Sequence, residues 1–272
     1  MKLEVQGREA YAYTGGRPFD ASLPALVFVH GALHDHSVWT LLARWFAHHG
    51  WGVLAVDLPA HGRSAGPALE SVEAMATWLL ALQDAAGVHE ASLVGHSMGS
   101  LVALEAASIA PVRAQRLVMV GTAYPMVVSP ALLESAVREP LVAIDNVNAY
   151  SHSTLAGKPS HPGPGMWLRG ANRTLMRRVQ AGGAEHNLFL TDFTACDRYR
   201  HGLEAAARVA CPSTLVLGAR DQMTGPKLSA DLARTLRAEV ITLPAGHALM
   251  TEAPDAILAA LRAALAPAAA IA

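Results

Sequence analysis

The chain has 272 residues, of which 52 % are hydrophobic and 16 % are charged, and its formal net charge is −1. This composition supports a large buried core and excludes a mainly disordered chain. The near-neutral charge, without a polybasic run, argues against nucleic acid or an anionic membrane surface as a partner. We see no apolar leader and no apolar stretch of about 18 residues, and the two cysteines form no disulfide framework. We therefore expect a cytoplasmic protein.

Strands and helices alternate through the first half of the sequence. Two short alternating segments, at 2–5 and 9–13, open the chain and can form a hairpin around Gly7. Continuous apolar runs, typical of strands covered on both faces, then alternate with helical segments. The strands are expected at 25–30, 51–56, 91–94 and 116–120, and the helices at 37–49, 71–86 and 98–109. Such alternation predicts an α/β fold with right-handed crossovers and a mainly parallel sheet.

The alternation stops after Gly121 and resumes near residue 213. The segment 122–209 contains helical fragments and a Gly- and Pro-rich stretch at 156–165, but no evident buried strand. Strands at 213–217 and 239–243 and helices at 226–236 and 254–265 follow. We interpret 1–121 and 210–272 as one α/β core and 122–209 as a helical cap (lid) over the carboxyl ends of the strands, where α/β sheets bind ligands.

The segment SLVGHSMGS contains Gly95-His96-Ser97-Met98-Gly99, which fits G-x-S-x-G between an apolar strand and a helix. In this context the pattern predicts a tight turn that projects the Ser97 hydroxyl above the sheet, with small residues letting the strand and helix approach. An ordinary Gly-rich turn is the alternative interpretation. The strand-turn-helix context favours Ser97 as a nucleophile.

A serine hydroxyl needs a base, and the base needs an acid to orient it. Asp221 follows the strand STLVL, and His247 follows the strand VITL, so both side chains leave the same sheet edge as Ser97. Helix capping by Asp221 and an ordinary loop position for His247 are the alternatives. Asp57, Asp192 and Asp197 are other candidate acids, but none occupies the position of Asp221 after a strand.

Two backbone N–H groups are candidates for an oxyanion hole. Gly31 permits a turn that aims the Ala32 N–H toward the site, and the Met98 N–H follows the nucleophile. Only the backbone of these two residues is required for this chemistry.

With these motifs in order, the sequence resembles the α/β-hydrolase superfamily over nearly its whole length. The matching segments are HGALHDHSVW, DLPAHGRS, GHSMGS, LVLGARDQMT and LPAGHALMTEAP, with Ala60 where the family usually has glycine. The resemblance implies an α/β-hydrolase fold: a mostly parallel sheet of eight strands flanked by helices, an antiparallel first hairpin and an inserted cap. It also disfavours haloalkane dehalogenases and epoxide hydrolases, which carry an aspartate nucleophile.

Other residues invite a functional interpretation. We expect His34, Trp167, His186 and Met223 as candidates for the substrate pocket, although each of the cap residues could equally be structural. The thirteen histidines lack the spacing of zinc motifs, and we expect neither a metal nor a cofactor. The oligomeric state is not readable from the sequence.

Three functional hypotheses remain. The first is a serine hydrolase that cleaves small or medium carboxylic esters through an acyl-enzyme, with a small-molecule ester as its only partner. The second is a C–C bond hydrolase of the meta-cleavage type, which would require an arginine for its carboxylated substrate. Arg169, Arg173, Arg177 and Arg178 are available for that role. The third is a non-catalytic ligand-binding protein on the same fold.

Overall fold

The computed structural model describes residues 1–153, 167–183 and 187–266. Its centre is an eight-stranded sheet with the order β1-β2-β4-β3-β5-β6-β7-β8. The strands are β1 (Lys2–Val5), β2 (Arg8–Tyr13), β3 (Ala25–Val29), β4 (Gly52–Val56), β5 (Ala91–His96), β6 (Ala114–Val120), β7 (Ser213–Gly218) and β8 (Glu239–Leu243). β1 pairs antiparallel with β2, and β2 pairs antiparallel with β4, whereas all other neighbours are parallel. The predicted mostly parallel sheet and its antiparallel opening hairpin are confirmed.

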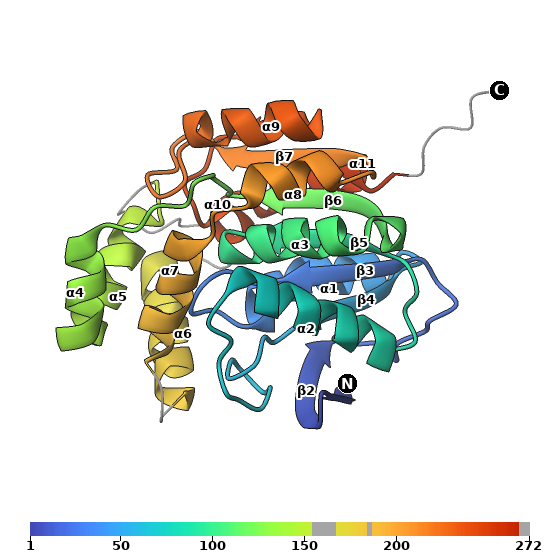
Figure 1. Ribbon diagram of the computed structural model, residues 1–272, viewed down its shortest axis with the longest axis horizontal. Helices are drawn as coiled ribbons and strands as arrows, with labels where there is room; N and C mark the ends of the chain where they lie inside the picture. The colour runs from blue at the N-terminus through green and yellow to red at the C-terminus, as the bar shows by residue number, and fades with distance from the viewer. Residues whose placement is uncertain (154–166, 184–186, 267–272) are drawn as a thin grey trace.

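Helices cover both faces of the sheet (Figure 1). One face packs against α2 (Val72–Ala85), α3 (Met98–Ile109), α8 (Gly202–Arg208) and α9 (Ala230–Leu236). The other face packs against α1 (Thr40–Ala47), α10 (Leu249–Glu252) and α11 (Pro254–Ala264). Short 3-10 turns lie at His36–Trp39, Pro111–Arg113 and Pro226–Ser229.

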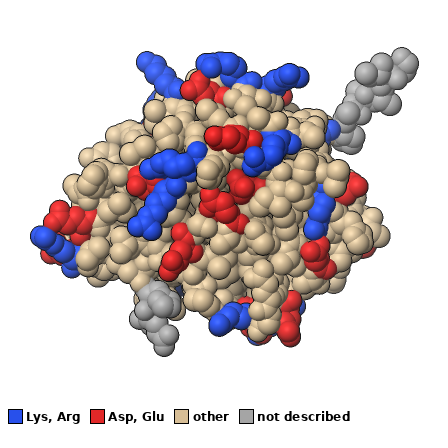
Figure 2. Space-filling model, viewed as in Figure 1, with Lys and Arg blue, Asp and Glu red and all other residues tan. Residues whose placement is uncertain are grey.

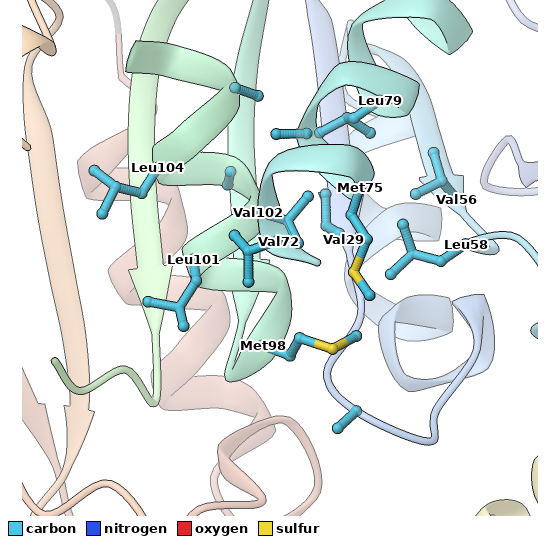
Figure 3. Close-up of a cluster of buried hydrophobic side chains, with 14 of the residues drawn as sticks. Val29, Val56, Leu58, Val72, Met75, Leu79, Met98, Leu101, Val102 and Leu104 are labelled. Carbon is cyan, nitrogen blue, oxygen red and sulfur yellow. The ribbon is translucent and has the colours of Figure 1, made fainter. Parts of the chain in front are cut away.

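Side-chain alternation along the strands divides the core into two layers. In β3, Val27 and Val29 belong to the layer with α2 and α3, whereas Leu26 and Phe28 belong to the layer with α1 and α11. Successive side chains of a strand point to opposite faces, so a strand buried on both sides is apolar throughout. Figure 3 shows part of the first layer, which includes Val29 of β3, Met75 of α2 and Leu101 of α3.

The helices between β6 and β7 extend from the main body beyond the sheet's edge (Figure 1). They are α4 (Pro130–Arg138), α5 (Pro140–Tyr150), α6 (Leu168–Gly182) and α7 (Leu188–Arg198), here called the insertion helices, followed by α8. Unlike the insertion helices, α8 packs in the layer that covers the sheet, where Arg208 donates to the Ser108 hydroxyl on α3 at 2.8 Å.

The first helical segment begins with a 3-10 turn that sets which of its side chains are buried. Leu41 has 59 % of its surface exposed, whereas Trp39 is fully buried. The reason is the 3-10 turn at His36–Trp39, which has about three residues per turn and rotates the following α-helix. The predicted start of α2 is confirmed, because the Ser71 hydroxyl accepts the Ala74 N–H at 3.1 Å.

Charged side chains are scattered over the face shown in Figure 2, with both signs interspersed. This distribution agrees with the net charge of −1. No helix of the described residues is both long enough and apolar enough to span a membrane.

Candidate active site

Ser97 lies in the turn between β5 and α3 and has a strained backbone, with φ 53° and ψ −122°. The turn needs glycine on both sides. A Cβ on Gly95 would lie 2.0 Å from the Gly99 carbonyl oxygen, and a Cβ on Gly99 would lie 2.4 Å from the carbonyl oxygens of Val29 and His30. Such contacts are sterically impossible without backbone movement. The strand and helix therefore approach closely, and the turn holds Ser97 above the sheet edge.

Hydrogen bonds from neighbouring elements hold this turn in place. The Ser97 N–H donates to the Val120 carbonyl oxygen at 2.9 Å, which joins the turn to β6. The Ser100 hydroxyl lies 2.5 Å from the Ser97 carbonyl oxygen and 2.7 Å from the Thr122 hydroxyl. The backbone of Ser97 is thus fixed by groups on both sides of the turn.

Asp221 and His247 meet at the ends of β7 and β8. His247 Nδ1 donates to Asp221 Oδ2 at 2.8 Å, and the Thr224 hydroxyl donates to the same oxygen at 2.7 Å. Asp221 Oδ1 accepts the Met223 and Thr224 N–H groups, each at 2.8 Å. Burial alone would raise the pKa of Asp221, but the nearby His247 and these hydrogen bonds hold that pKa well below its usual range. Asp221 is therefore ionised, and it fixes the Nδ1–H tautomer of His247, leaving Nε2 as a possible proton acceptor.

The loop that carries His247 is anchored on three sides. His96 Nε2 donates to the His247 carbonyl oxygen at 2.9 Å. The Ala248 N–H donates to the Ser151 carbonyl oxygen at 2.9 Å, and the Glu252 carboxylate accepts the Gly246 N–H at 3.1 Å. Burial, together with the nearby His247 and His34, lowers the pKa of His96 well below 6.5, so His96 is a neutral donor. His96 thus supports the position of His247.

The two residues predicted to supply oxyanion donors, Ala32 and Met98, both lie close to Ser97. Met98 follows it directly in the sequence. Ala32 lines the same cavity as Ser97. A Cβ on the preceding Gly31 would lie 3.1 Å from the Ser97 Cβ, which shows how closely this turn approaches the serine. Among the described turns and loops, no backbone hydrogen bond is donated by the Ala32 or the Met98 N–H. The Met98 side chain points into the buried cluster (Figure 3), so only its backbone faces the site.

A cavity of about 490 Å³ opens above Ser97. Its walls come from the segment before α4, from α4, α5 and α7, and from the loop after β7. The lining side chains are mainly apolar and include Met126, Val128, Leu132, Val147, Phe193 and Met223. Ser129, Asn146, Tyr150 and Gln222 add neutral polar groups. None of the described residues that line the cavity is a lysine or an arginine.

The structure separates the four expected pocket residues. Met223 lines the cavity with Ser97. Trp167 does not: it is 52 % exposed and faces a separate groove along α6, so the expectation for Trp167 is corrected. His34 also lies outside this cavity and instead lines a small neighbouring pocket that includes His247. Its ring bonds to the Ala32 carbonyl oxygen and to Asn172, each at 2.8 Å. His186 lies outside the described residues.

The other candidate acids are bound elsewhere. Asp57 accepts the His36 and Arg63 N–H groups at 2.7 and 2.9 Å. Asp197 accepts the Val128 N–H at 2.9 Å, and Asp192 bonds to His61 at 2.9 Å. Of the three, none has a described hydrogen bond to His247. Asp221 is therefore the carboxylate that the structure brings to this histidine.

One group of side chains has the spacing of a metal site, namely Asp35, His36 and Asp57, whose possible ligand atoms lie within 4.8 Å of one another. These atoms already have partners. His36 Nδ1 bonds to Asp57 Oδ1 at 2.8 Å, and Arg178 pairs with Asp35 at 2.7 Å. These contacts show that the three side chains connect the loop after β3 to the loop after β4 and to α6.

Comparison with known proteins identifies the family. A sequence model described as the alpha/beta hydrolase fold matches residues 24–254. The chain belongs to this family. An esterase from Exiguobacterium antarcticum superposes with a TM-score of 0.80 at 14 % identity, covering 97 % of this chain and 98 % of that one. At this identity the likeness shows the fold alone.

Curated relatives match at higher identity but over part of their length. The dihydrolipoyllysine-residue acetyltransferase component of an acetoin cleaving system from Pseudomonas putida is 29 % identical, covering 94 % of this chain and 66 % of that protein. The sn-1-specific diacylglycerol lipase ABHD11 from Mus musculus is 39 % identical, over 37 % of this chain and 33 % of that protein. In both cases the chain matches less than two thirds of the relative.

One feature of the site, the Thr224 hydroxyl, escaped sequence reasoning. Thr224 places its hydroxyl against Asp221 Oδ2 and 3.1 Å from His247 Nδ1. A threonine three residues after the acid is a usable signal, because short-range side-chain bonds of this kind are common for aspartate in turns. Ala60, which stands where the resemblance expects glycine, has a positive φ of 67°, a backbone conformation that glycine adopts more readily than alanine.

Proposed function

We propose that this α/β hydrolase is a serine hydrolase that cleaves uncharged small or medium carboxylic esters. The observation that carries the proposal is the strained turn that presents Ser97 to a mainly apolar cavity, with the Asp221–His247 pair on neighbouring strand ends. The esterase and lipase names among similar proteins are consistent with this assignment.

In the proposed reaction, His247 Nε2 takes the Ser97 proton as the serine oxygen attacks the ester carbonyl. Asp221 holds the reactive tautomer and stabilises the imidazolium that forms. The Ala32 and Met98 N–H groups stabilise the negative oxygen of the tetrahedral intermediate. His247 then returns the proton to the leaving alcohol, and a water molecule hydrolyses the acyl-enzyme by the same route, releasing the acid and restoring Ser97.

The composition of the cavity wall favours the hypothesis of a neutral substrate over that of a carboxylated one. A C–C bond hydrolase acting on a carboxylated substrate needs a cation in its pocket, but the described lining contains none. Arg173 and Arg177 instead bind Asp145 at 2.6 and 3.0 Å, and Arg178 binds Asp35. We propose that the insertion helices α4, α5, α6 and α7 act as the cap over the site and that the apolar side chains lining the cavity select the acyl group.

Hydrolysis of p-nitrophenyl esters from acetate to palmitate, by wild type and Ser97→Ala in parallel, tests this proposal. We expect turnover that peaks at short or medium chains and is abolished by the substitution. Full activity of a folded S97A variant would overturn the assignment of the nucleophile.

A fluorophosphonate probe separates catalysis from mere binding. We expect wild type to be labelled at Ser97 and S97A to remain unlabelled. If folded wild-type protein is not labelled by the probe and hydrolyses none of the esters, the ester hydrolase proposal is wrong. The ligand-binding hypothesis is then favoured.

A further inference from the structure

A buried carboxylate of α7 connects the insertion helices to two loops of the core. Asp192 is 0 % exposed, and its Oδ2 accepts the Leu33 N–H at 2.7 Å and bonds to His61 Nε2 at 2.9 Å. Leu33 directly follows Ala32, and His61 lies in the loop after β4. One oxygen atom thus joins three segments that are far apart in the sequence.

The turn held by Asp192 has a conformation that its own sequence disfavours. The His34 N–H donates to the Gly31 carbonyl oxygen at 3.3 Å, which closes a four-residue turn. Within this turn Leu33 has a positive φ of 55°, whereas the φ of Ala32 is not positive. A positive φ at the third residue alone defines a type II turn, where glycine is the usual residue. Leucine is strained there, so an outside contact is needed to hold the central peptide in this orientation.

That central peptide is bound at both ends. Its N–H, from Leu33, is taken by Asp192, and its carbonyl oxygen, from Ala32, accepts a hydrogen bond from His34 Nδ1 at 2.8 Å. If the Asp192 contact were lost, rotation of this peptide would relieve the strain at Leu33. The peptide that would rotate begins at Ala32, whose own N–H is one of the two proposed oxyanion donors.

The partners of His61 determine its protonation state. Nδ1 lies 3.0 Å from the Pro59 carbonyl oxygen, and Nε2 lies 2.9 Å from the Asp192 carboxylate. Both partners are acceptors, so both ring nitrogens must carry a proton and the imidazole is positively charged. Burial alone would lower the pKa of His61, but the Asp192 charge and its hydrogen bond raise the pKa above 6.5.

The remaining charged and titratable groups around His61 fit this assignment. The His30 ring lies 5.0 Å away; its Nδ1 bonds to the Gly31 carbonyl oxygen and its Nε2 accepts the Leu58 N–H, so His30 is neutral. Asp57, at the start of the same loop, adds a second negative charge that favours the charged form of His61. The cluster therefore contains one cationic histidine beside one neutral histidine.

We propose that Asp192, together with protonated His61, is a positioning residue that holds the turn carrying the Ala32 N–H and so links the docking of α7 to the competence of the oxyanion hole. The inference rests on the proposed ester hydrolase function. Neither side chain lines the cavity above Ser97, and the neighbour of Asp192 in sequence, Phe193, does. The contact thus acts on the reaction through the turn and not through the substrate.

Three substitutions separate this role from simple packing. Asp192→Asn keeps the shape but removes the charge, so the pKa of buried His61 falls. The amide oxygen must still accept the Leu33 N–H and therefore also faces His61 Nε2, so Nε2 keeps its proton and Nδ1 loses its proton at neutral pH. Asp192→Ala removes the accepting oxygen altogether. His61→Gln keeps an uncharged amide donor that does not titrate. Asp197→Asn, on the same helix, is the matched control, because its retained oxygen can still accept the Val128 N–H.

We expect Asp192→Ala to lose about 10- to 100-fold in kcat on a p-nitrophenyl ester with little change in KM, since misplacing a group by about 1 Å can cost 10²-fold. D192N keeps the oxygen that accepts the Leu33 N–H and should lose less. The kcat ratio of D192N to wild type should rise as the pH falls below 6.5, because His61 regains its proton. The same ratio for H61Q and for D197N should be independent of pH.

A direct readout does not require turnover. In ¹⁵N NMR spectra of the wild type, both ring nitrogens of His61 should be protonated at neutral pH, and in D192N one should lose its proton. A neutral His61 in wild type would overturn the proposal, and so would an active wild type whose Asp192→Ala variant keeps its kcat. If Asp192→Ala does not fold, the pH dependence of D192N and the wild-type NMR spectrum still test the proposal. If wild-type protein shows neither ester turnover nor probe labelling, the ester hydrolase function is refuted. The NMR spectrum then still tests whether His61 and Asp192 form an ion pair.

Discussion

Replacement of Asp221 by asparagine tests the arrangement of the site most sharply, because its hydrogen bonds dictate how the amide must orient. Asp221 Oδ1 accepts two backbone N–H groups, from Met223 and Thr224, each at 2.8 Å. An asparagine must keep its carbonyl oxygen at that position, since the alternative would place an NH₂ group against two donors. The NH₂ group then faces His247 Nδ1.

An NH₂ group at this position reverses the tautomer of His247. Nδ1 must now accept a hydrogen bond, so the proton moves to Nε2, and Nε2 can no longer take the proton of Ser97. The Thr224 hydroxyl can rotate to accept from the amide and does not oppose the change. Loss of the correct tautomer in a serine triad lowers kcat by about 10⁴, which corresponds to roughly 5.4 kcal/mol in the barrier.

The assay is steady-state hydrolysis of a p-nitrophenyl ester by wild type, D221N and D197N, with active sites counted by fluorophosphonate labelling and folding checked by circular dichroism. We expect D221N to lose about 10⁴ in kcat with little change in KM, and D197N to stay within about twofold of wild type. A folded D221N variant that retains more than about a tenth of kcat, while S97A retains nothing, would refute the geometric reasoning.

Three further predictions concern single contacts. Thr224→Val removes one hydrogen bond to Asp221, worth about 0.5–1.5 kcal/mol, and should lower kcat about 2- to 10-fold in the same assay. Gly99→Ala forces a Cβ within 2.4 Å of backbone carbonyls and should destabilise the fold by about 3 kcal/mol or more in urea unfolding, whereas Gly182→Ala, with open space, should not destabilise it. Burial lowers the pKa of His30 from 6.5 to about 4, so the folded state resists its protonation; roughly 3 kcal/mol of stability should be lost as the pH falls through this interval. Urea unfolding of wild type and His30→Gln at both ends of the interval checks this, and an equal loss in both would contradict it.

The sheet and the order of motifs were predictable because their signals are local. A strand buried on both faces is apolar throughout, as in β3 and β5, and the glycines around Ser97 are required by contacts within a few residues. The acid and base could be selected by their positions after strands, because the carboxyl ends of parallel strands lie at one edge of a sheet.

The walls of the site were less predictable because they depend on how distant segments pack. Trp167 begins an amphipathic helix, and the sequence does not say toward which side of α6 the ring turns. The contact between His61 and Asp192 joins residues 131 positions apart. His61 lies in the segment DLPAHGRS, but Asp192 lies in none of the matching segments, so no pattern pairs the two. Such pairings are decided by the docking of the insertion helices, which local patterns do not encode.

The insertion helices contact the reacting loops as well as the substrate cavity. At the end of α5, the Ser151 carbonyl oxygen accepts the Ala248 N–H, and its hydroxyl bonds back to the Val147 carbonyl oxygen at 2.8 Å. Val147 lines the cavity, and so does Phe193, the residue after Asp192. An acyl group that fills the cavity therefore presses on the two helices that hold the His247 loop and the Ala32 turn. Because interactions that improve the transition state raise kcat while uniform binding changes only KM, acyl chain length should change kcat as well as KM.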